Sequence, residues 1–217
     1  MKLIIGNKNY SSWSLRAWLL LSANDIPFEE IRIPLFTATT HQALSEYTAV
    51  GKVPVLLDHG RVVWDSLAIC ETISENHLAG RGWPSDSHTR AEARACCAEM
   101  HSGFFAIREH MPMNCRAQDR RINQTPALDT EISRLDNMWS GLREKYNSDG
   151  PWLFGDFSIA DCFFAPMVFR FNTYGVALSQ RSQDYIEQIL SHPKVKLWLA
   201  QARNETETID RAEVGYV

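Results

Sequence analysis

The first third of the chain alternates short apolar runs with stretches whose apolar residues recur at helical spacing. Lys2–Gly6 and Phe28–Ile33 are predicted strands, and a proline ends the second of them. Between them, the range from Ser12 to about Ala23 has the periodicity of a helix, and a shorter helical stretch follows at Thr40–Thr48. This part of the pattern predicts strands that alternate with helices.

A hairpin and a further helix come next. Val53–Leu57 and Arg61–Trp64 have the apolar character of strands, and Asp58-His59-Gly60 between them is a hairpin signal. Asp65-Ser66 then provides capping residues for a helix of about three turns. The order strand, helix, strand, helix, strand, strand, helix predicts a small α/β domain with a mixed sheet over residues 1–79.

Residues 80–87 break the periodicity with two glycines and a proline, and we interpret them as an interdomain linker. Residues 88–217 are helical in pattern. Within them, Arg90–His110 has two neighbouring apolar faces, a second helix is expected to begin at Pro126, and a last one is expected after His192-Pro193. The second domain is therefore predicted to be an all-α helical bundle.

One local motif stands out in this helical part. Ser158 and Asp161 have the spacing of a capping box, with Asp in place of the usual Glu or Gln. The residues that follow are rich in phenylalanine and other apolar types. The motif therefore predicts the start of a largely buried helix.

Charge and composition narrow the possible functions. The 217-residue chain has a net charge of -4, and the acidic excess is spread over both halves, which argues against nucleic acid as a partner. The first apolar run is too short for a secretory signal, and no stretch approaches a membrane span. The five cysteines form no C-x-x-C motif and suit free thiols in a reducing cytoplasm, and no Cys/His cluster has the spacing of a metal site.

The serines after the first predicted strand form the first candidate site. A polar turn leads from that strand into Ser11 and Ser12, where the first helix begins. Free N–H groups and the positive end of the helix dipole meet at such a point, so a negative sulfur or oxygen would be stabilised there. Serines in this position also serve as plain helix caps, and the pattern alone leaves both interpretations open.

Val53-Pro54 forms the second candidate site. A proline at the start of an otherwise apolar strand is confined to an edge, a strand start or a bulge. With a cis peptide bond, Val53 could direct its own N–H and C=O outward, toward an extended peptide-like ligand. An ordinary trans proline that opens a strand is the alternative.

Asp65-Ser66 forms the third candidate site, at the junction of a strand and a helix. The serine hydroxyl and the first-turn N–H groups could hold a carboxylate, and the aspartate could neutralise an ammonium group. An α-amino acid carries both charges. A double helix cap with no ligand is the simpler alternative.

Together these three sites resemble the cytosolic glutathione S-transferase superfamily. The matching stretches lie in the right order along the chain: Ser11-Ser12-Trp13-Ser14-Leu15-Arg16, Gly51-Lys52-Val53-Pro54-Val55-Leu56, Asp65-Ser66-Leu67-Ala68-Ile69 and Gly155-Asp156-Phe157-Ser158-Ile159-Ala160-Asp161. The serine loop is most similar to serine-type, zeta-like members, which include maleylacetoacetate isomerases. Trp13 departs from that class, whose members have cysteine at this position.

The resemblance implies a thioredoxin-like N-terminal domain that binds glutathione as a co-substrate, without a metal. It makes Ser11 the first candidate to donate a hydrogen bond to the glutathione sulfur, with Ser12 as its neighbour or substitute. The other implied glutathione contacts are the Val53 backbone beside a cis Pro54 at the cysteinyl part, Asp65 and Ser66 at the γ-glutamyl end, and Lys52 and His41 at the glycyl carboxylate.

The helical domain is implied to complete a pocket for the second substrate. Candidate lining residues are Trp13, Phe104, Phe105 and Met111, although a stripe of this kind also forms simple core.

Three functions are consistent with these features. The first is a cytoplasmic, homodimeric glutathione transferase that activates glutathione as the thiolate for attack on a small electrophile, as in detoxification. The second is a glutathione-dependent cis–trans isomerase, which ranks lower because of Trp13 and because the sequence has no clear cluster of basic residues for a dianionic substrate. The third is a non-catalytic interaction module, in which loss of the serine and Asp-Ser positions would be expected; this chain keeps both.

Overall fold

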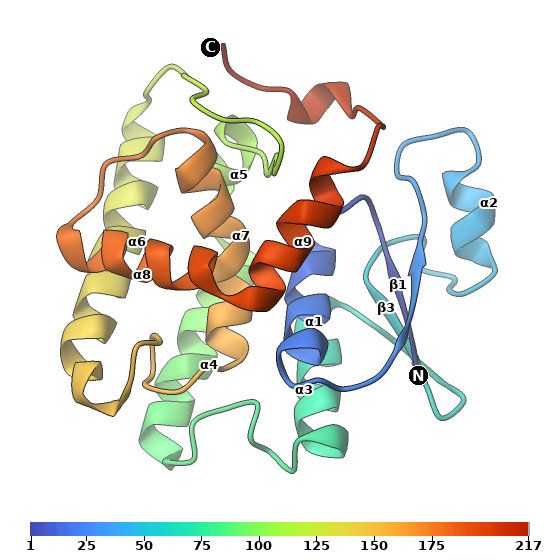
Figure 1. Cartoon of the computed structure of the whole chain (residues 1–217), viewed down its shortest axis with the longest axis horizontal. Helices are drawn as coiled ribbons and strands as arrows, with labels where there is room; N and C mark the ends of the chain where they lie inside the picture. Colours follow the sequence, from blue (N-terminus) through green and yellow to red (C-terminus); the bar gives the residue numbers. More distant parts are fainter. Residues whose placement is uncertain (217) are drawn as a thin grey trace.

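A computed structural model describes residues 1–216 and contains a mixed sheet in the first part of the chain (Figure 1). Its strands are β1 (Lys2–Ile5), β2 (Glu29–Arg32), β3 (Val55–Asp58) and β4 (Arg61–Trp64). The strand order is β2-β1-β3-β4, with β1 parallel to β2 and antiparallel to β3, and β3 antiparallel to β4. The predicted mixed sheet is therefore confirmed, including the hairpin of β3 and β4.

Helices cover the two faces of this sheet unequally. The longer helices α1 (Ser12–Ala23) and α3 (Ser66–His77) share a core with Leu3 and Ile5, whereas Ile4 packs toward the short helix α2 (Thr40–Ser45). Because successive side chains of a strand point to opposite faces, β1 supplies both cores. In Figure 1, α2 lies alone on the outer side of the sheet.

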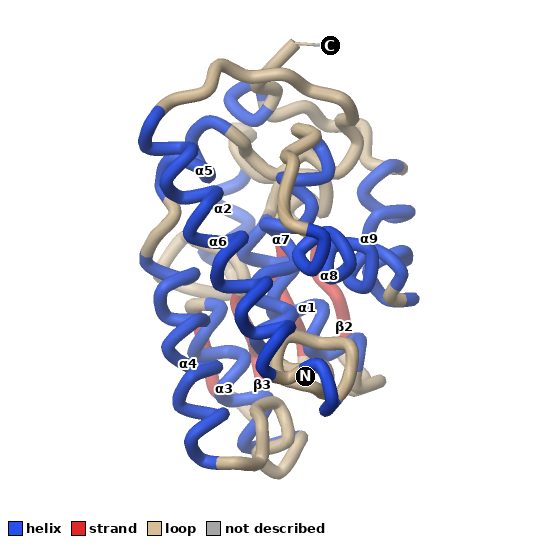
Figure 2. Tube along the Cα trace, turned by 90° about the vertical axis from the view of Figure 1, so that its left-hand side faces the viewer, coloured by secondary structure: helices blue, strands red, loops and turns tan. Residues whose placement is uncertain are grey.

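The rest of the chain is helical, as predicted. Its helices are α4 (Ser87–Ser102), α5 (Phe105–His110), α6 (Pro126–Lys145), α7 (Ile159–Thr173), α8 (Gln180–Ser191) and α9 (Pro193–Arg203), with 3-10 turns at Asn147–Asp149 and Asp210–Ala212. Viewed from the side of these helices, the strands lie behind them (Figure 2). Within residues 1–216, no helix combines the length and apolar character needed to cross a membrane.

Helix α7 joins the two halves of the molecule. All but one of its residues are buried, and it packs against α1, α4 and α8. A helix that is buried on all sides lies in the interior of a protein. The phenylalanine-rich helix predicted from the sequence is therefore the centre of the hydrophobic core.

The capping box at the start of α7 is also confirmed. The Ser158 hydroxyl accepts from the Ala160 N–H, and a carboxylate oxygen of Asp161 accepts from the Ser158 N–H at 2.9 Å. Asp161 is fully buried and also accepts from the Leu153 N–H at 3.2 Å and the Tyr185 hydroxyl at 3.1 Å. The motif thus connects the loop before α7 to helix α8.

Two features differ from the sequence prediction. The range Arg90–His110 is two helices, because Phe104 has a left-handed backbone with φ 60° that separates α4 from α5. Helix α8 was not predicted, since Tyr185, Ile186 and Ile189 are its only large buried apolar residues among many polar ones. The break at Phe104 depends on tertiary packing, whereas α8 has a local apolar face at helical spacing, formed by Tyr185, Ile186, Ile189 and Leu190, which the prediction missed.

Candidate functional site

A cavity of about 750 Å³ lies between the sheet half and the helical half. Its walls come from the β1–α1 loop, the region of α2, the turn before β3, the segment around α5 and the C-terminal tail. The lining residues are Tyr10, Ser11, Ser12, Trp13, Leu35, Phe36, Thr37, Thr40, His41, Leu44, Gly51, Lys52, Val53, Arg108, Glu109, Pro112, Met113, Arg170, Ile209, Arg211 and Ala212. This volume is in the range of small-molecule binding sites.

The two candidate serines lie at the start of α1, as the sequence predicts. Ser11 is the N-cap residue, and its hydroxyl lies 2.7 Å from the hydroxyl of Ser14. Ser11 is 6% exposed and Ser12 is 5% exposed, and both reach the cavity. The N-terminus of α1 therefore faces the cavity with two hydroxyl groups beside it.

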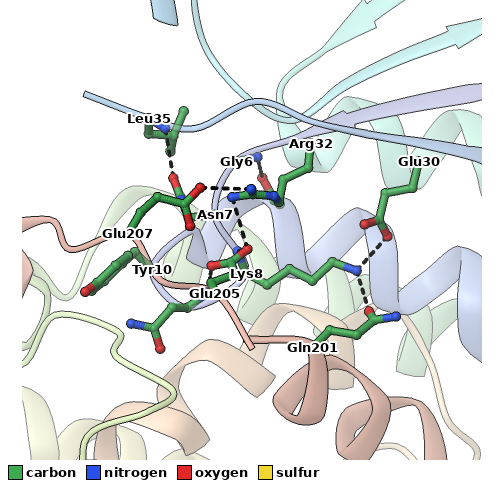
Figure 3. Close-up of polar contacts among 12 residues, drawn as sticks. Gly6, Asn7, Lys8, Tyr10, Glu30, Arg32, Leu35, Gln201, Glu205 and Glu207 are labelled. Carbon is green, nitrogen blue, oxygen red and sulfur yellow. Dashed lines mark hydrogen bonds and ion pairs between the residues drawn. The ribbon is translucent and has the colours of Figure 1, made fainter. Parts of the chain in front are cut away.

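The loop before these serines is held by the C-terminal segment (Figure 3). The Glu205 carboxylate accepts from the backbone N–H of Lys8 at 2.7 Å and of Asn9 at 3.0 Å. The Lys8 carbonyl accepts from the indole N–H of Trp198 at 3.0 Å. Residues almost two hundred positions away thus satisfy the backbone of the loop that leads to Ser11.

The Lys8 side chain strengthens the same contact. Its ammonium group donates to Glu30 at 2.7 Å and to Gln201 at 2.5 Å, and it lies 4.8 Å from the centre of the Trp18 ring (Figure 3). Burial lowers the pKa of this lysine, while the neighbouring Glu30 opposes that change. A buried charge with a partner is costly to disturb, so this ion pair anchors β2 and α9 to the loop.

The glutathione-contact candidates fall into two groups. Val53, Lys52 and His41 line the same cavity as the serines, and the Val53–Pro54 peptide bond is cis. Asp65 is not among the residues that line this cavity.

Asp65 and Ser66 instead form the start of α3. One carboxylate oxygen of Asp65 accepts from the Leu67 N–H at 2.8 Å, and the other pairs with His101 at 3.0 Å. Ser66 is almost fully buried and accepts from the guanidinium of Arg16 at 3.3 Å. The cap predicted from the sequence is confirmed, and α4 supplies a histidine that the sequence did not connect with it.

Trp13 lies between the cavity and this second group. Its ring lies 5.1 Å from the His101 ring, and it is flanked by the guanidinium groups of Arg16 at 4.2 Å and Arg108 at 4.9 Å. Of the four predicted lining residues of the acceptor pocket, Trp13 is the one that reaches the cavity. The side chains of Phe104 and Met111 are in the core, and Phe105 is at the surface with 69% exposure.

The break between α4 and α5 explains this outcome. Phe104 and Phe105 were expected to line the pocket together, but the left-handed residue Phe104 turns the chain before α5 begins. The residues of this segment that line the cavity are Arg108, Glu109, Pro112 and Met113.

Three arginines line the cavity, each from a different part of the chain. Arg108 comes from α5, Arg170 from α7 and Arg211 from the C-terminal tail. Arg170 is 5% exposed, donates to the Met111 carbonyl at 2.5 Å, and has no partner for its Nε–H within residues 1–216. No local motif of the sequence includes all three arginines, so their common position at the cavity depends on tertiary packing.

The electrostatics of these arginines favour an anion. Burial and, to a lesser degree, repulsion from Arg108 lower the pKa of Arg170 to about 9. A guanidinium with this pKa is still charged at neutral pH. Glu109 is the one carboxylate among the cavity-lining residues of the described chain, against several cations. A bound carboxylate or thiolate would relieve that imbalance.

The cysteines lie away from this chemistry. All five are free thiols, and Cys70, Cys97, Cys115 and Cys162 are buried. Burial raises the pKa of the Cys115 thiol to about 12 and that of Cys96 to about 11, so they are protonated at neutral pH. Within residues 1–216, no group of three or more His, Cys, Asp or Glu side chains could hold a metal ion.

Comparison with known proteins gives two family matches. Residues 10–76 match the family model of the glutathione S-transferase N-terminal domain, and residues 123–201 match that of the glutathione S-transferase C-terminal domain. A probable maleylacetoacetate isomerase of Caenorhabditis elegans is 25% identical over 171 residues, which are 78% of each chain. A 2,5-dichlorohydroquinone reductive dechlorinase of Sphingobium indicum is 24% identical over 78% of this chain and 68% of its own length.

Solved structures share the fold. A glutathione transferase homologue from Burkholderia with bound glutathione has a TM-score of 0.72 and 24% identity, over 94% of this chain and 98% of its own. A bacterial zeta-class maleyl pyruvate isomerase has a TM-score of 0.73 and 21% identity, over 95% of this chain and all of its own.

Proposed function

The chain belongs to the glutathione S-transferase family of glutathione-dependent enzymes, and on that premise we propose that glutathione binds in the 750 Å³ cavity with its sulfur against the Ser11 hydroxyl. The observation that carries this proposal is the position of Ser11, which caps α1 and lines the cavity together with Val53 and Lys52. Glutathione is a co-substrate of this enzyme, and its thiolate attacks a small electrophile.

The chemistry follows from the pKa of the thiol. A free thiol has a pKa of about 8.5, and the thiolate is the nucleophile. A hydrogen bond to a charged acceptor is worth about 1.5–3 kcal/mol, which corresponds to about one or two pKa units. Donation from Ser11, aided by the positive end of the α1 dipole, therefore makes the thiolate the dominant form near neutral pH without a general base.

The remaining parts of glutathione have partners nearby. The backbone of Val53 pairs with the cysteinyl part, and Lys52 and His41 take the glycyl carboxylate, since all three line the cavity. The γ-glutamyl end extends past Trp13 to Ser66 and the first turn of α3. The Asp65 carboxylate already pairs with His101. An ammonium group of the ligand would therefore bind to a carboxylate that also contacts this histidine.

Replacement of Ser11 by alanine tests this assignment. We expect the pKa of the bound glutathione thiol to rise by about one to two units and turnover at neutral pH to fall about 10- to 100-fold. Affinity for glutathione should change little, because the contacts to the rest of the tripeptide remain. The ultraviolet absorbance of the thiolate, followed against pH with saturating glutathione, measures the shift directly.

Ser12→Ala is measured beside it, since either serine could contact the sulfur. A shift with Ser12→Ala and none with Ser11→Ala would transfer the role to Ser12. If neither variant changes the titration, the proposed thiolate contact is wrong.

The cationic wall supports a second candidate function. In a glutathione-dependent cis–trans isomerase, the thiolate adds to a carbon–carbon double bond conjugated to a carbonyl, the resulting single bond rotates, and the thiolate is expelled unchanged. The sequence ranked this function lower for want of a basic cluster. Arg108, Arg170 and Arg211 all line the cavity, and a relative is named as a probable maleylacetoacetate isomerase.

The two functions can be distinguished by the effect of Arg108→Gln on two substrates, one that carries carboxylates and one that does not. We expect Arg108→Gln to lower kcat/KM for maleylacetoacetate about 10- to 100-fold, the value of one charge-assisted hydrogen bond, if the isomerase function is correct. Turnover of a neutral nitroaryl halide should change about twofold or less. Arg61→Gln, a change on the exposed strand β4, is the matched control for loss of one positive charge. Equal losses with both substrates would contradict a role for Arg108 in anion recognition.

A homodimer is part of the proposal as well. Val62 and Trp64 on β4 are large apolar residues that are 44% and 53% exposed, and they border a shallow groove with Leu67 and Ala68. A contiguous patch of exposed apolar side chains is typical of a surface that contacts another molecule. This face of β4 and α3 is therefore where the second copy is proposed to pack.

A further inference from the structure

The start of α1 contains a series of hydrogen bonds that ends at the cavity. The Gly6 N–H donates to the Ser14 hydroxyl at 3.1 Å, and the Ser14 hydroxyl lies 2.7 Å from the Ser11 hydroxyl. The Ser14 N–H also points at the Ser11 oxygen, at 3.4 Å. Ser14 is fully buried, whereas Ser11 is at the cavity.

The distance between the two hydroxyl oxygens is compatible with donation in either direction. The hydrogen-bond partners available to each hydroxyl decide between the two directions. The Ser14 oxygen already accepts from Gly6, and its own hydrogen needs an acceptor because the residue is fully buried. Ser11 is the acceptor within reach. If Ser11 donated instead, the Ser14 hydrogen would be left without a partner, at a cost of about 1–3 kcal/mol.

We propose that Ser14 is a positioning residue that donates to Ser11 and thereby leaves the Ser11 hydrogen free to point into the cavity. This inference rests on the proposed function, in which that hydrogen is donated to the glutathione sulfur. It also assigns the sulfur contact to Ser11, since Ser12 lies outside this series of hydrogen bonds.

The first donor of the series is held firmly. Gly6 follows β1 and packs so closely against Leu35 that a Cβ atom there would lie 2.8 Å from the Leu35 Cγ. The Leu35 N–H in turn donates to the Asn7 side chain at 2.8 Å (Figure 3). Gly6 is therefore closely packed at the point where its N–H donates to Ser14.

Such a series also strengthens its last bond. Each hydrogen bond in a buried chain polarises the next one by roughly 10–30%. The Ser11 hydroxyl is consequently a better donor to a thiolate when Ser14 donates to it. Removal of the Ser14 hydroxyl weakens that donation and frees Ser11 to turn away from the cavity.

The full chain with bound glutathione provides the test, with Ser14→Ala, Ser14→Cys, Ser11→Ala and the double variant Ser11→Ala/Ser14→Ala. We expect Ser14→Ala to raise the pKa of the bound thiol by about half a unit, with an effect in the same direction from the weaker donor in Ser14→Cys. The double variant should match Ser11→Ala, because Ser14 acts only through Ser11. Ser22→Ala, on the same helix away from the cavity, should titrate like the unaltered protein.

The outcomes separate the two claims. If Ser11→Ala shifts the titration but Ser14→Ala and Ser14→Cys do not, the positioning role is wrong and the proposed function stands. If the effects of Ser11→Ala and Ser14→Ala add in the double variant, Ser14 does not act through Ser11, and the inference is again wrong. If Ser11→Ala itself leaves the titration unchanged, the proposed contact between Ser11 and the sulfur is wrong, and the role of Ser14 is wrong with it.

Discussion

Replacement of Asp161 by alanine is expected to lower the free energy of unfolding by about 3–5 kcal/mol, because three buried donors lose their acceptor at a cost of about 1–3 kcal/mol each. The carboxylate is fully buried and accepts from the backbone N–H groups of Leu153 and Ser158 and from the Tyr185 hydroxyl. Alanine would leave these buried donors without partners. Denaturation by urea, read by circular dichroism, measures the loss.

Asp156→Ala is the matched control, since Asp156 is exposed and lies in the same loop. We expect it to change the free energy of unfolding by about 0.5 kcal/mol or less. A similarly small effect of Asp161→Ala would mean that the capping box does not hold the loop to α7 and α8.

The contribution of Asp161 should also depend on pH. Burial raises its pKa to about 6, from an ordinary 3.8, against the opposing effect of its hydrogen bonds. A carboxyl whose pKa is higher in the folded protein holds its proton more tightly there. Its stabilisation is therefore full below the unfolded pKa and is lost as pH rises through the folded one. The difference in unfolding free energy between the unaltered protein and Asp161→Ala should be larger near pH 4 than near pH 7.

Glu205→Ala is expected to have the second largest effect, a loss of about 2–4 kcal/mol of stability together with a mobile serine loop, because two buried N–H donors lose their acceptor. These donors are the backbone amides of Lys8 and Asn9. Hydrogen exchange at both amides should speed up, and turnover should fall because Ser11 follows in the same loop.

Glu207→Gln provides the control for this experiment. Glu207 pairs with Arg32 at 2.8 Å, as Glu205 does at a longer distance, but the hydrogen bonds to the Lys8 and Asn9 amides come from Glu205. Loss of the Glu207 charge should leave the exchange of the two amides unchanged. Equal protection of these amides in Glu205→Ala and in the unaltered protein would show that the C-terminal segment does not hold the loop.

Local sequence signals predicted much of this molecule because their causes are local. The serine cap of α1 and the capping box at Ser158 involve residues three positions apart, so the spacing itself carries the information. The strands were predictable for a similar reason, since alternating or apolar stretches of a few residues lie between turn residues.

The features that sequence reasoning missed are contacts between distant segments. Glu205 and Lys8 are 197 positions apart, and Arg170 and Arg211 reach the cavity from a core helix and from the tail. No period or motif connects such residues, because only the packing of the two halves brings them together. The prediction that Phe104 and Phe105 line the pocket was wrong for a local reason. The left-handed backbone of Phe104 ends α4 and changes the direction of the chain, although the apolar pattern continues.

The structure of the complex with glutathione tests the central claim most directly. The proposal predicts the glutathione sulfur within hydrogen-bond reach of the Ser11 oxygen, with the cysteinyl part paired to the Val53 backbone and the Ser11–Ser14 contact intact. A tripeptide bound elsewhere, or bound in the cavity with its sulfur turned away from Ser11, would contradict it.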